Sequence, residues 1–215
     1  MLTLKLKSNK QFNKQIYSTC LVGNKLMIAT PVKTYTPEEY LELETTSTTR
    51  NEYRNGEIIP MTGGTPTHNE LIGALTVMLR LGLKGKPLQV FVTDQRLWVP
   101  ERAIHTYPDV MVVPRPIILQ EGRKDTVTQP VFIAEVLSNS TKNYDRSEKF
   151  ADYRTIPSFQ EYLLIDQVKP HVERYIKQSE NQWLFIEYDN LDDRFMLSSV
   201  GIEVSLTDLY ENIEF

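Results

Sequence analysis

Hydrophobic positions along the chain recur with two periods, one typical of helices and one of strands. Leu71, Leu75 and Leu79 fall at helical spacing, which predicts an amphipathic helix from His68 to about Gly82 with one buried face. Alternating or near-continuous apolar runs predict strands. These runs are LQVFVTDQRLWVP and YPDVMVV, interpreted as neighbours joined by a polar loop, then PVFIAEVLS, QEYLLID, HVERYIK and QWLFIEYD, with VSLTDLYENIEF as a strand followed by a short helix.

Turn and cap residues punctuate this pattern. Thr36 can cap a helix that has Pro37 at its first position, which predicts a short helix over TYTPEEYLEL. Asn55-Gly56 between two strand-like arms is the usual signal of a two-residue hairpin. Asp145 with Glu148 resembles a capping box and predicts a helix that ends near Arg154, before Pro157.

The order of these elements is helix, hairpin, helix, strands, helix and strands. It predicts a mixed α/β (α+β) fold in which helices flank a central mixed β-sheet, built as one domain over residues 27–215. Residues 1–26 contain five lysines and no acid, and we treat them as a basic N-terminal extension. They are either an extra element packed on the domain or an upstream extension if translation begins at Met27, with a flexible basic arm less favoured.

Composition narrows the range of functions. The chain has 215 residues, 40% hydrophobic and 24% charged, without an apolar run near the roughly 18 residues of a membrane helix. No apolar signal-peptide core is present, so we expect a cytoplasmic protein without a membrane partner. The net charge of −4 restricts any nucleic-acid contact to a local patch. One cysteine, Cys20, and three histidines leave mostly carboxylate metal chemistry, which favours hard cations such as Mg²⁺.

Two acids stand in apolar strand-like runs, Asp109 in YPDVMVV and Glu135 in PVFIAEVLS. An ionised carboxylate in such a run costs several kcal/mol unless a cation, a metal or hydrogen-bond donors compensate it. Asp109 could simply cap the start of its strand, whereas Glu135 has no cheap structural explanation. On adjacent strands the two carboxylates could together bind a divalent cation that promotes phosphodiester hydrolysis.

A metal-dependent nuclease commonly adds a lysine that assists the attacking water. Leu137 occupies the second position after Glu135, so a simple Glu-x-Lys spacing fails. Lys149, on the helix that follows, is the better candidate, and Arg146 and Tyr153 share its face at spacings of three and four. Arg146 either contacts phosphate or pairs with an acid.

Other polar residues have two interpretations each. Glu52 could supply a third acid to the metal or form a cross-strand charge pair. His68 could support the site or serve as a helix-cap or packing residue. Asp94 could reach the same site, although a turn is the favoured interpretation. We expect three aromatic residues in the core and not as platforms for bases: Trp98, Trp183 and Phe185.

The stretch YPDVMVV followed by FIAEVLSNSTKNYDRSEKFADYRTIPSFQEYLLID resembles the Uma-two family of proposed restriction endonucleases, within the PD-(D/E)XK nuclease superfamily. The resemblance covers roughly Thr34 to Leu209 and includes the EYRNGEIIPM hairpin. It implies a restriction-endonuclease-like core, with Asp109 and Glu135 as metal-binding acids and Lys149 as a displaced catalytic lysine.

The favoured function is a Mg²⁺-dependent endonuclease that hydrolyses DNA, with Mn²⁺ as a possible substitute and a homodimer as a plausible assembly. The alternative is an inactive nucleic-acid-binding or interaction module on a nuclease fold, favoured by the acidic net charge and the missing Glu-x-Lys spacing. A third, weaker hypothesis is a hydrolase or transposon-linked protein acting on RNA or another phosphate ester.

Overall fold

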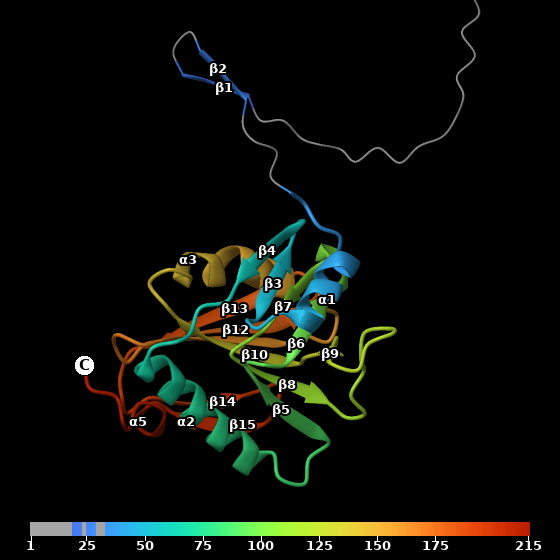
Figure 1. Cartoon of the computed structure of the whole chain (residues 1–215). Coiled ribbons are helices and arrows are strands. Elements are labelled where there is room, and N and C mark those ends of the chain that lie inside the picture. The colour runs from blue at the N-terminus through green and yellow to red at the C-terminus, as the bar shows by residue number, and fades with distance from the viewer. Residues whose placement is uncertain (1–18, 23–24, 29–32) are drawn as a thin grey trace, which may run out of the picture. The chain divides into compact units, whose positions relative to one another are not determined.

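The computed structural model describes residues 19–22, 25–28 and 33–215 (Figure 1). The chain divides into two units, Met1–Thr34 and Tyr35–Phe215. In the first unit, β1 (Thr19–Val22) and β2 (Lys25–Ile28) pair as an antiparallel hairpin. Most of the expected N-terminal extension, residues 1–18 and 23–24, lies outside the described residues, so the choice among its interpretations stays a prediction.

A six-stranded mixed sheet forms the centre of the second unit, with the order β13-β12-β11-β10-β8-β5. Its strands are β5 (Leu88–Val92), β8 (Val110–Pro114), β10 (Phe132–Leu137), β11 (Glu161–Asp166), β12 (Val172–Ser179) and β13 (Gln182–Tyr188). β10 and β11 run parallel, and the other neighbours run antiparallel. The predicted mixed α/β fold is confirmed.

One face of this sheet is covered by α2 (Pro66–Gly82), the pair β14 (Arg194–Leu197) and β15 (Ile202–Ser205), and α5 (Leu206–Leu209) (Figure 1). Leu71, Leu75 and Leu79 of α2 are fully buried against it. Burying one such side chain contributes roughly 1.5–3 kcal/mol, so this stripe anchors the helix to the sheet. The helix begins at Pro66, two residues earlier than the predicted start at His68. Thr65 caps it, because its hydroxyl accepts a hydrogen bond from the His68 N–H.

The opposite face packs against a second, five-stranded sheet of order β4-β3-β7-β6-β9 and against a short helical segment. The strands are β3 (Asn51–Arg54), β4 (Glu57–Pro60), β6 (Arg96–Val99), β7 (Ile104–Thr106) and β9 (Thr126–Val127). Helix α1 (Pro37–Thr46) precedes β3, and a 3₁₀ turn, η1 (Pro100–Arg102), follows β6. The helical segment consists of α3 (Lys142–Tyr144), a π-helical stretch η2 (Asp145–Lys149) and α4 (Phe150–Tyr153).

The strongest local signals are confirmed. Thr36 and Glu39 form a reciprocal capping box at the start of α1, and Pro37 opens the helix. The β3–β4 turn places Asn55 at φ 51° and Gly56 at φ 90°. Both angles lie in the left-handed region that a two-residue hairpin of this type requires and that Asn-Gly tolerates.

The stretch LQVFVTDQRLWVP is two strands, because the chain turns at Asp94 and passes from one sheet to the other. β5 pairs with β8 in the central sheet, as expected for neighbours, but β6 belongs to the five-stranded sheet. Asp94 is exposed on the turn and lies 3.6 Å from Arg50, so its turn interpretation agrees with the structure. Five short strands of the described chain, β1, β2, β7, β9 and β14, were not anticipated.

The helix expected to begin at Asp145 begins at Lys142 instead. Asp145 is buried inside the helical segment, and its carboxylate lies 3.5 Å from Lys149 Nζ. The expected capping box with Glu148 is therefore wrong, because Asp145 pairs with a cation one turn later and caps no N-terminus.

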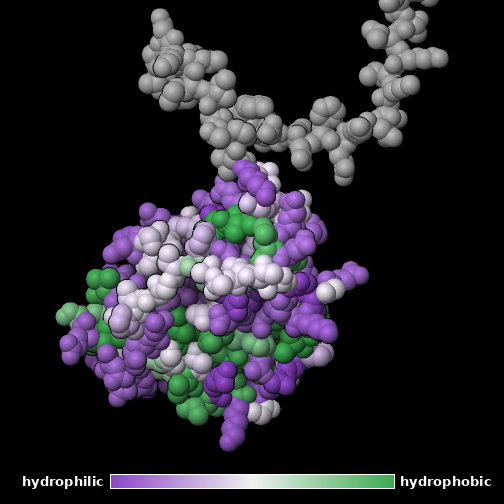
Figure 2. Space-filling view, viewed as in Figure 1, coloured by the Kyte–Doolittle hydropathy of each residue, from purple (hydrophilic) through white to green (hydrophobic). Residues whose placement is uncertain are grey.

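The surface of the second unit is mostly polar on the face that Figure 2 shows, with apolar groups between the polar ones. Trp183 is partly buried and packs on the edge of the core against Phe150 and Phe159. Phe185 is 46% exposed, so the expectation of a core position is wrong for it, and Trp98 is only half-buried. No helix in the described part of the chain is long and apolar enough to cross a membrane.

His105 on β7 is fully buried between aromatic rings. Its ring lies 4.2 Å from that of Trp98 and 5.2 Å from that of Tyr40, and its Nε2 lies 3.0 Å from Gln120 Oε1. Burial lowers the pKa of His105 to about 4, and the nearby charge of Arg96 acts in the same direction. The folded protein therefore keeps this imidazole neutral.

We predict that this histidine makes the folded state sensitive to acid. An unfolded histidine has a pKa of about 6.5, so the unfolded chain binds more protons between about pH 6.5 and 4. The contribution of His105 is present above this window and is lost as pH falls, at up to about 1.4 kcal/mol per pH unit. Urea unfolding should show that the wild type loses stability relative to His105→Phe as pH falls below 6. The difference in the free energy of unfolding between the two proteins should be constant from pH 7 to 8. A difference independent of pH throughout would contradict the prediction.

Candidate active site

A cavity of about 360 Å³ opens where β8 begins and β10 ends. The β3–β4 hairpin with its following loop, the start of α2 and the α3–η2 segment close it. We call it the acid pocket, and its ionisable lining residues are Glu52, His68, Asp109, Glu135, Asp145 and Lys149, with the phenols of Tyr107 and Tyr144 beside them. Five of the residues expected at the site, Glu52, His68, Asp109, Glu135 and Lys149, therefore meet in one cavity, whereas Arg146 and Tyr153 do not line it.

Asp109 and Glu135 lie side by side because β8 and β10 are antiparallel neighbours. Asp109 precedes Val110, which pairs with Ala134, so the next residue along β10 is Glu135. The Asp109 N–H donates to Glu135 Oε2 (3.3 Å), and the Val136 N–H donates to Asp109 Oδ2 (2.8 Å). Each acid is thus fixed by the backbone of the other acid's strand.

The buried carboxylate of Glu135 is compensated by a nearby cation, the ammonium of Lys149. Lys149 Nζ lies 2.9 Å from Glu135 Oε1, and the Tyr153 hydroxyl donates to the same oxygen (2.8 Å). Both interactions come from the same side of the sheet, because Glu135 alternates with Ala134 and shares the face of Ile133. The short helical segment that follows β10 therefore compensates its buried acid.

Burial is the main influence on the pKa of Glu135. It raises that pKa, the charges of Asp109 and Asp145 act in the same direction, and the ammonium of Lys149 opposes them. Burial lowers the pKa of Lys149, but the carboxylates of Glu135 and Asp145 outweigh burial and raise it well above its usual value. Lys149 is therefore an ammonium at neutral pH.

His68 serves as a partner of Asp109. Its Nε2 lies 3.3 Å from Asp109 Oδ2, and this hydrogen bond is the main cause of the raised pKa of His68. Gly64 permits the arrangement, because a Cβ there would lie 2.6 Å from His68 Nδ1. Of the two interpretations of His68, the structure favours a role at the site, although the cap itself comes from Thr65.

Glu52 lines the acid pocket and accepts a hydrogen bond from the Thr106 hydroxyl. The residue opposite Glu52 on β4 is Ile59, so the suggested cross-strand charge pair is not formed. Arg146 does not line the acid pocket. Its guanidinium binds Glu173, with Nη2 2.6 Å and Nε 2.7 Å from Oε1, so the acid-pair interpretation of Arg146 agrees with the structure.

The carboxylates fit a hard divalent cation. Mg²⁺ is usually held by one or two carboxylates together with waters and substrate phosphate oxygens. Asp109 and Glu135 supply two adjacent carboxylates, and Asp109 Oδ1 accepts no hydrogen bond from any described residue. No group of three or more His, Cys, Asp or Glu side chains at metal-binding distance occurs among the described residues, so Glu52 does not complete a three-acid cluster.

Two supporting residues were missed from the sequence. Asp145 lies beside Lys149, and its spacing of four residues on a helix could have indicated the pair. Thr106, which holds Glu52, gave no local signal, because its strand meets β3 only in the folded sheet.

Comparison with known proteins identifies the family of the chain. The Uma2 (Uma-two) family model, described as "Putative restriction endonuclease", matches residues 37–207. The chain belongs to this family. The matched range includes the acid pocket and agrees with the resemblance carried by YPDVMVV and FIAEVLS.

Two curated relatives of the chain are uncharacterized proteins of Synechocystis sp. One is 42% identical over 75% of this chain and 92% of its own length, and the other is 32% identical over 86% and 96%. A crystal structure from Anabaena variabilis, described as a putative nuclease belonging to DUF820, shares the fold with a TM-score of 0.66 at 19% identity. The alignment covers 82% of this chain and 98% of that one.

We predict that Lys149→Met lowers the free energy of unfolding by about 3 kcal/mol at neutral pH, since it leaves Glu135 and Asp145 buried without their cation. Lys142→Met, an exposed lysine of the same helical segment, should change stability by less than about 0.5 kcal/mol. Adding Glu135→Gln to Lys149→Met should recover part of the loss. Chemical denaturation measures these free energies of unfolding. Equal stability of Lys149→Met and Lys142→Met would rule out a structural role for the Lys149 ion pairs.

Proposed function

We propose that this protein is a Mg²⁺-dependent endonuclease that hydrolyses phosphodiester bonds of DNA. The observation that carries the proposal is the pairing of two carboxylates, Asp109 and Glu135, on adjacent strands with the ammonium of Lys149 in one cavity. The description of the Uma2 family as restriction endonucleases and of the Anabaena variabilis protein as a nuclease supports phosphodiester chemistry.

Asp109 and Glu135 would hold the cation, with Glu52 as a further acid at the rim, and Mn²⁺ could replace Mg²⁺. When bound, such a cation polarises a phosphoryl oxygen and lowers the pKa of a bound water. Tyr153 holds the orientation of Glu135, and His68 holds that of Asp109. These contacts keep both carboxylates directed into the acid pocket before substrate arrives.

Lys149 acts as a hydrogen-bond donor and a positive charge. Because its pKa is raised well above the usual value, it cannot take a proton from water at neutral pH. It can orient the attacking water through an N–H, and it can stabilise the negative charge that grows on the phosphoryl oxygens in the transition state. Asp145 keeps the ammonium within this part of the cavity.

Cutting both strands of a duplex calls for two such sites, so the proposal includes a homodimer on double-stranded DNA.

We predict Mg²⁺-dependent nicking of plasmid DNA that Glu135→Ala and Lys149→Ala each lower by about a hundredfold or more, since the first removes a ligand of the cation and the second removes a positive charge that stabilises the transition state. Lys84→Ala is the matched control, because Lys84 is exposed beyond the far end of α2, about 25 Å from the start of the helix at the acid pocket. Its nicking rate should equal that of wild type, with EDTA abolishing cleavage in every case.

Calorimetry separates the two roles. Glu135→Ala should lose Mg²⁺ binding, whereas Lys149→Ala should retain it, because Lys149 is no ligand. A wild-type protein that cuts neither plasmid nor single-stranded DNA and releases no heat with Mg²⁺ or Mn²⁺ would sink the enzyme proposal and leave the inactive binding module.

A further inference from the structure

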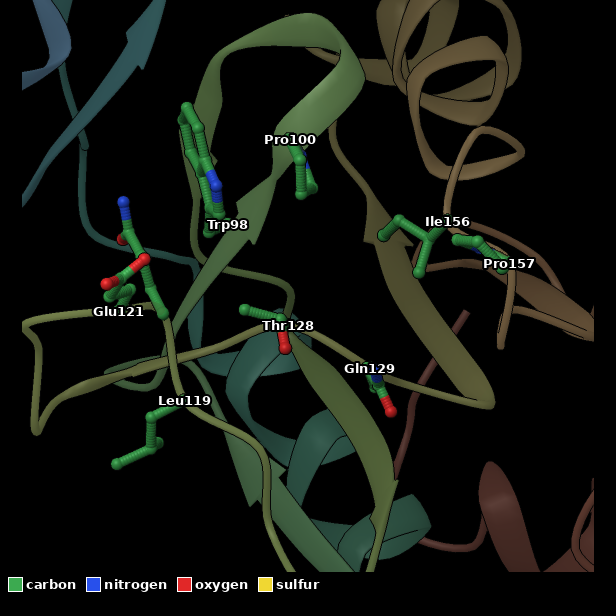
Figure 3. Close-up of a pocket in the computed structure, with 9 residues that line it drawn as sticks. Trp98, Pro100, Leu119, Glu121, Thr128, Gln129, Ile156 and Pro157 are labelled. Carbon is green, nitrogen blue, oxygen red and sulfur yellow. The ribbon is translucent and has the colours of Figure 1, made fainter.

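A second hollow of about 440 Å³ lies outside the acid pocket, between β6, the loop that leads into and out of β9, and the turn after α4 (Figure 3). Nothing in the proposed reaction uses it. The lining residues that matter here are Trp98, Gln120, Glu121, Gln129, Ile156 and Pro157. We call it the Trp98 hollow.

Trp98 supplies a supported aromatic surface to the hollow. One face of its indole stacks on His105, with ring centroids 4.2 Å apart and an angle of 28° between the planes. Tyr40 packs against the same histidine from within the core. The indole is half-buried and lines the hollow, so part of its surface is exposed there while His105 supports one of its faces.

The polar side chains of the hollow have unused hydrogen-bonding capacity. In the described part of the chain, the side chains of Glu121 and Gln129 make no hydrogen bond or ion pair with another residue, and Figure 3 shows both at the hollow. Gln120 Oε1 is paired with His105 Nε2, which leaves its amide N–H groups to donate. Among the described residues no lysine or arginine lines the hollow, so it suits a neutral ring with hydrogen-bond donors better than a phosphate.

We propose that the Trp98 hollow binds a nucleobase with an exocyclic amino group, stacked on Trp98. Aromatic stacking accepts any base, a carboxylate such as that of Glu121 accepts from the amino group of cytosine, and glutamine amides pair with adenine. Enzymes that hold an unstacked base use this combination of a stacking ring and polar groups on the base edge. The inference rests on the proposed nuclease function, which supplies the nucleic acid.

The hollow and the acid pocket are joined through α4. Tyr153 in α4 donates to Glu135, and the Ile156 N–H donates to the Tyr153 carbonyl (3.0 Å). Ile156 and Pro157 then form one wall of the hollow. A DNA strand that places a base against Trp98 therefore rests on the same short segment that orients the catalytic acid, which gives the hollow a role in positioning substrate.

The test uses the full chain in EDTA, so that no cleavage occurs, and a short single-stranded DNA with a central 2-aminopurine. This purine carries an exocyclic amino group at C2, as guanine does, and its fluorescence is quenched on stacking. We expect quenching on binding, and a loss of affinity of about tenfold for Trp98→Ala and, measured by competition with the reporter strand, for DNA with an abasic site in place of the reporter base. Phe185→Ala, which removes an exposed aromatic ring outside the hollow, should bind as wild type does.

Trp98→Phe and Gln129→Ala keep the test valid if Trp98→Ala fails to fold. Trp98→Phe should retain quenching, and Gln129→Ala, a change at an exposed position, should weaken binding of the base-containing DNA but not of the abasic DNA. Equal affinity for base-containing and abasic DNA, or Trp98-dependent binding of a proline-rich peptide in place of DNA, would overturn the proposal. Plasmid cleavage without any effect of Trp98→Ala on DNA binding would overturn the base-binding proposal and leave the nuclease proposal standing. Trp98-dependent base binding without cleavage in Mg²⁺ would support the base-binding proposal and overturn the nuclease proposal.

Discussion

The ion pair between Glu135 and Lys149 is the interaction on which the rest of the site depends. A carboxylate in the middle of a buried strand loses its hydration, and only a close cation with further hydrogen bonds can offset that loss. The chain meets this demand locally, since the helical segment directly after β10 returns Lys149 and Tyr153 to the same acid. The ammonium of Lys149 in that pair is also the positive charge that would lie near a phosphodiester substrate in the acid pocket.

Two hydrophobic cores hold this pair in place from opposite sides of the central sheet. Ala134 and Val136 pack toward α2, while Ile133 and Leu137 pack toward the five-stranded sheet and α4. Packing on both faces gives β10 little freedom to move along or across the sheet, because interiors of this density transmit any shift to their neighbours. The position of Glu135 is therefore set by side chains that have no chemistry of their own.

Sequence reasoning succeeded where the cause is local. The Thr36 cap, the Asn55-Gly56 turn and the apolar run of β10 each depend on a few neighbouring residues. It failed where the cause is tertiary. The division of LQVFVTDQRLWVP between two sheets, the hydrogen bond from Thr106 to Glu52 and the partial exposure of Trp98 arise only when distant segments meet. Asp145 lies between these cases, because its spacing from Lys149 was visible but its resemblance to a cap suggested another role.

Side chains along β10 point alternately to the two faces of the sheet, so Glu135 reaches Lys149 only while the number of residues before it in the strand is unchanged. Successive residues of a strand point to opposite faces, so losing a single residue between Phe132 and Glu135 would exchange the two sets. The acid would then point into the apolar packing of α2, far from Lys149, while alanine or valine would face the ammonium. Substitutions in this strand can be absorbed by repacking, but a change of length by one cannot, and insertions or deletions of one residue should therefore be far rarer here than substitutions among functional relatives.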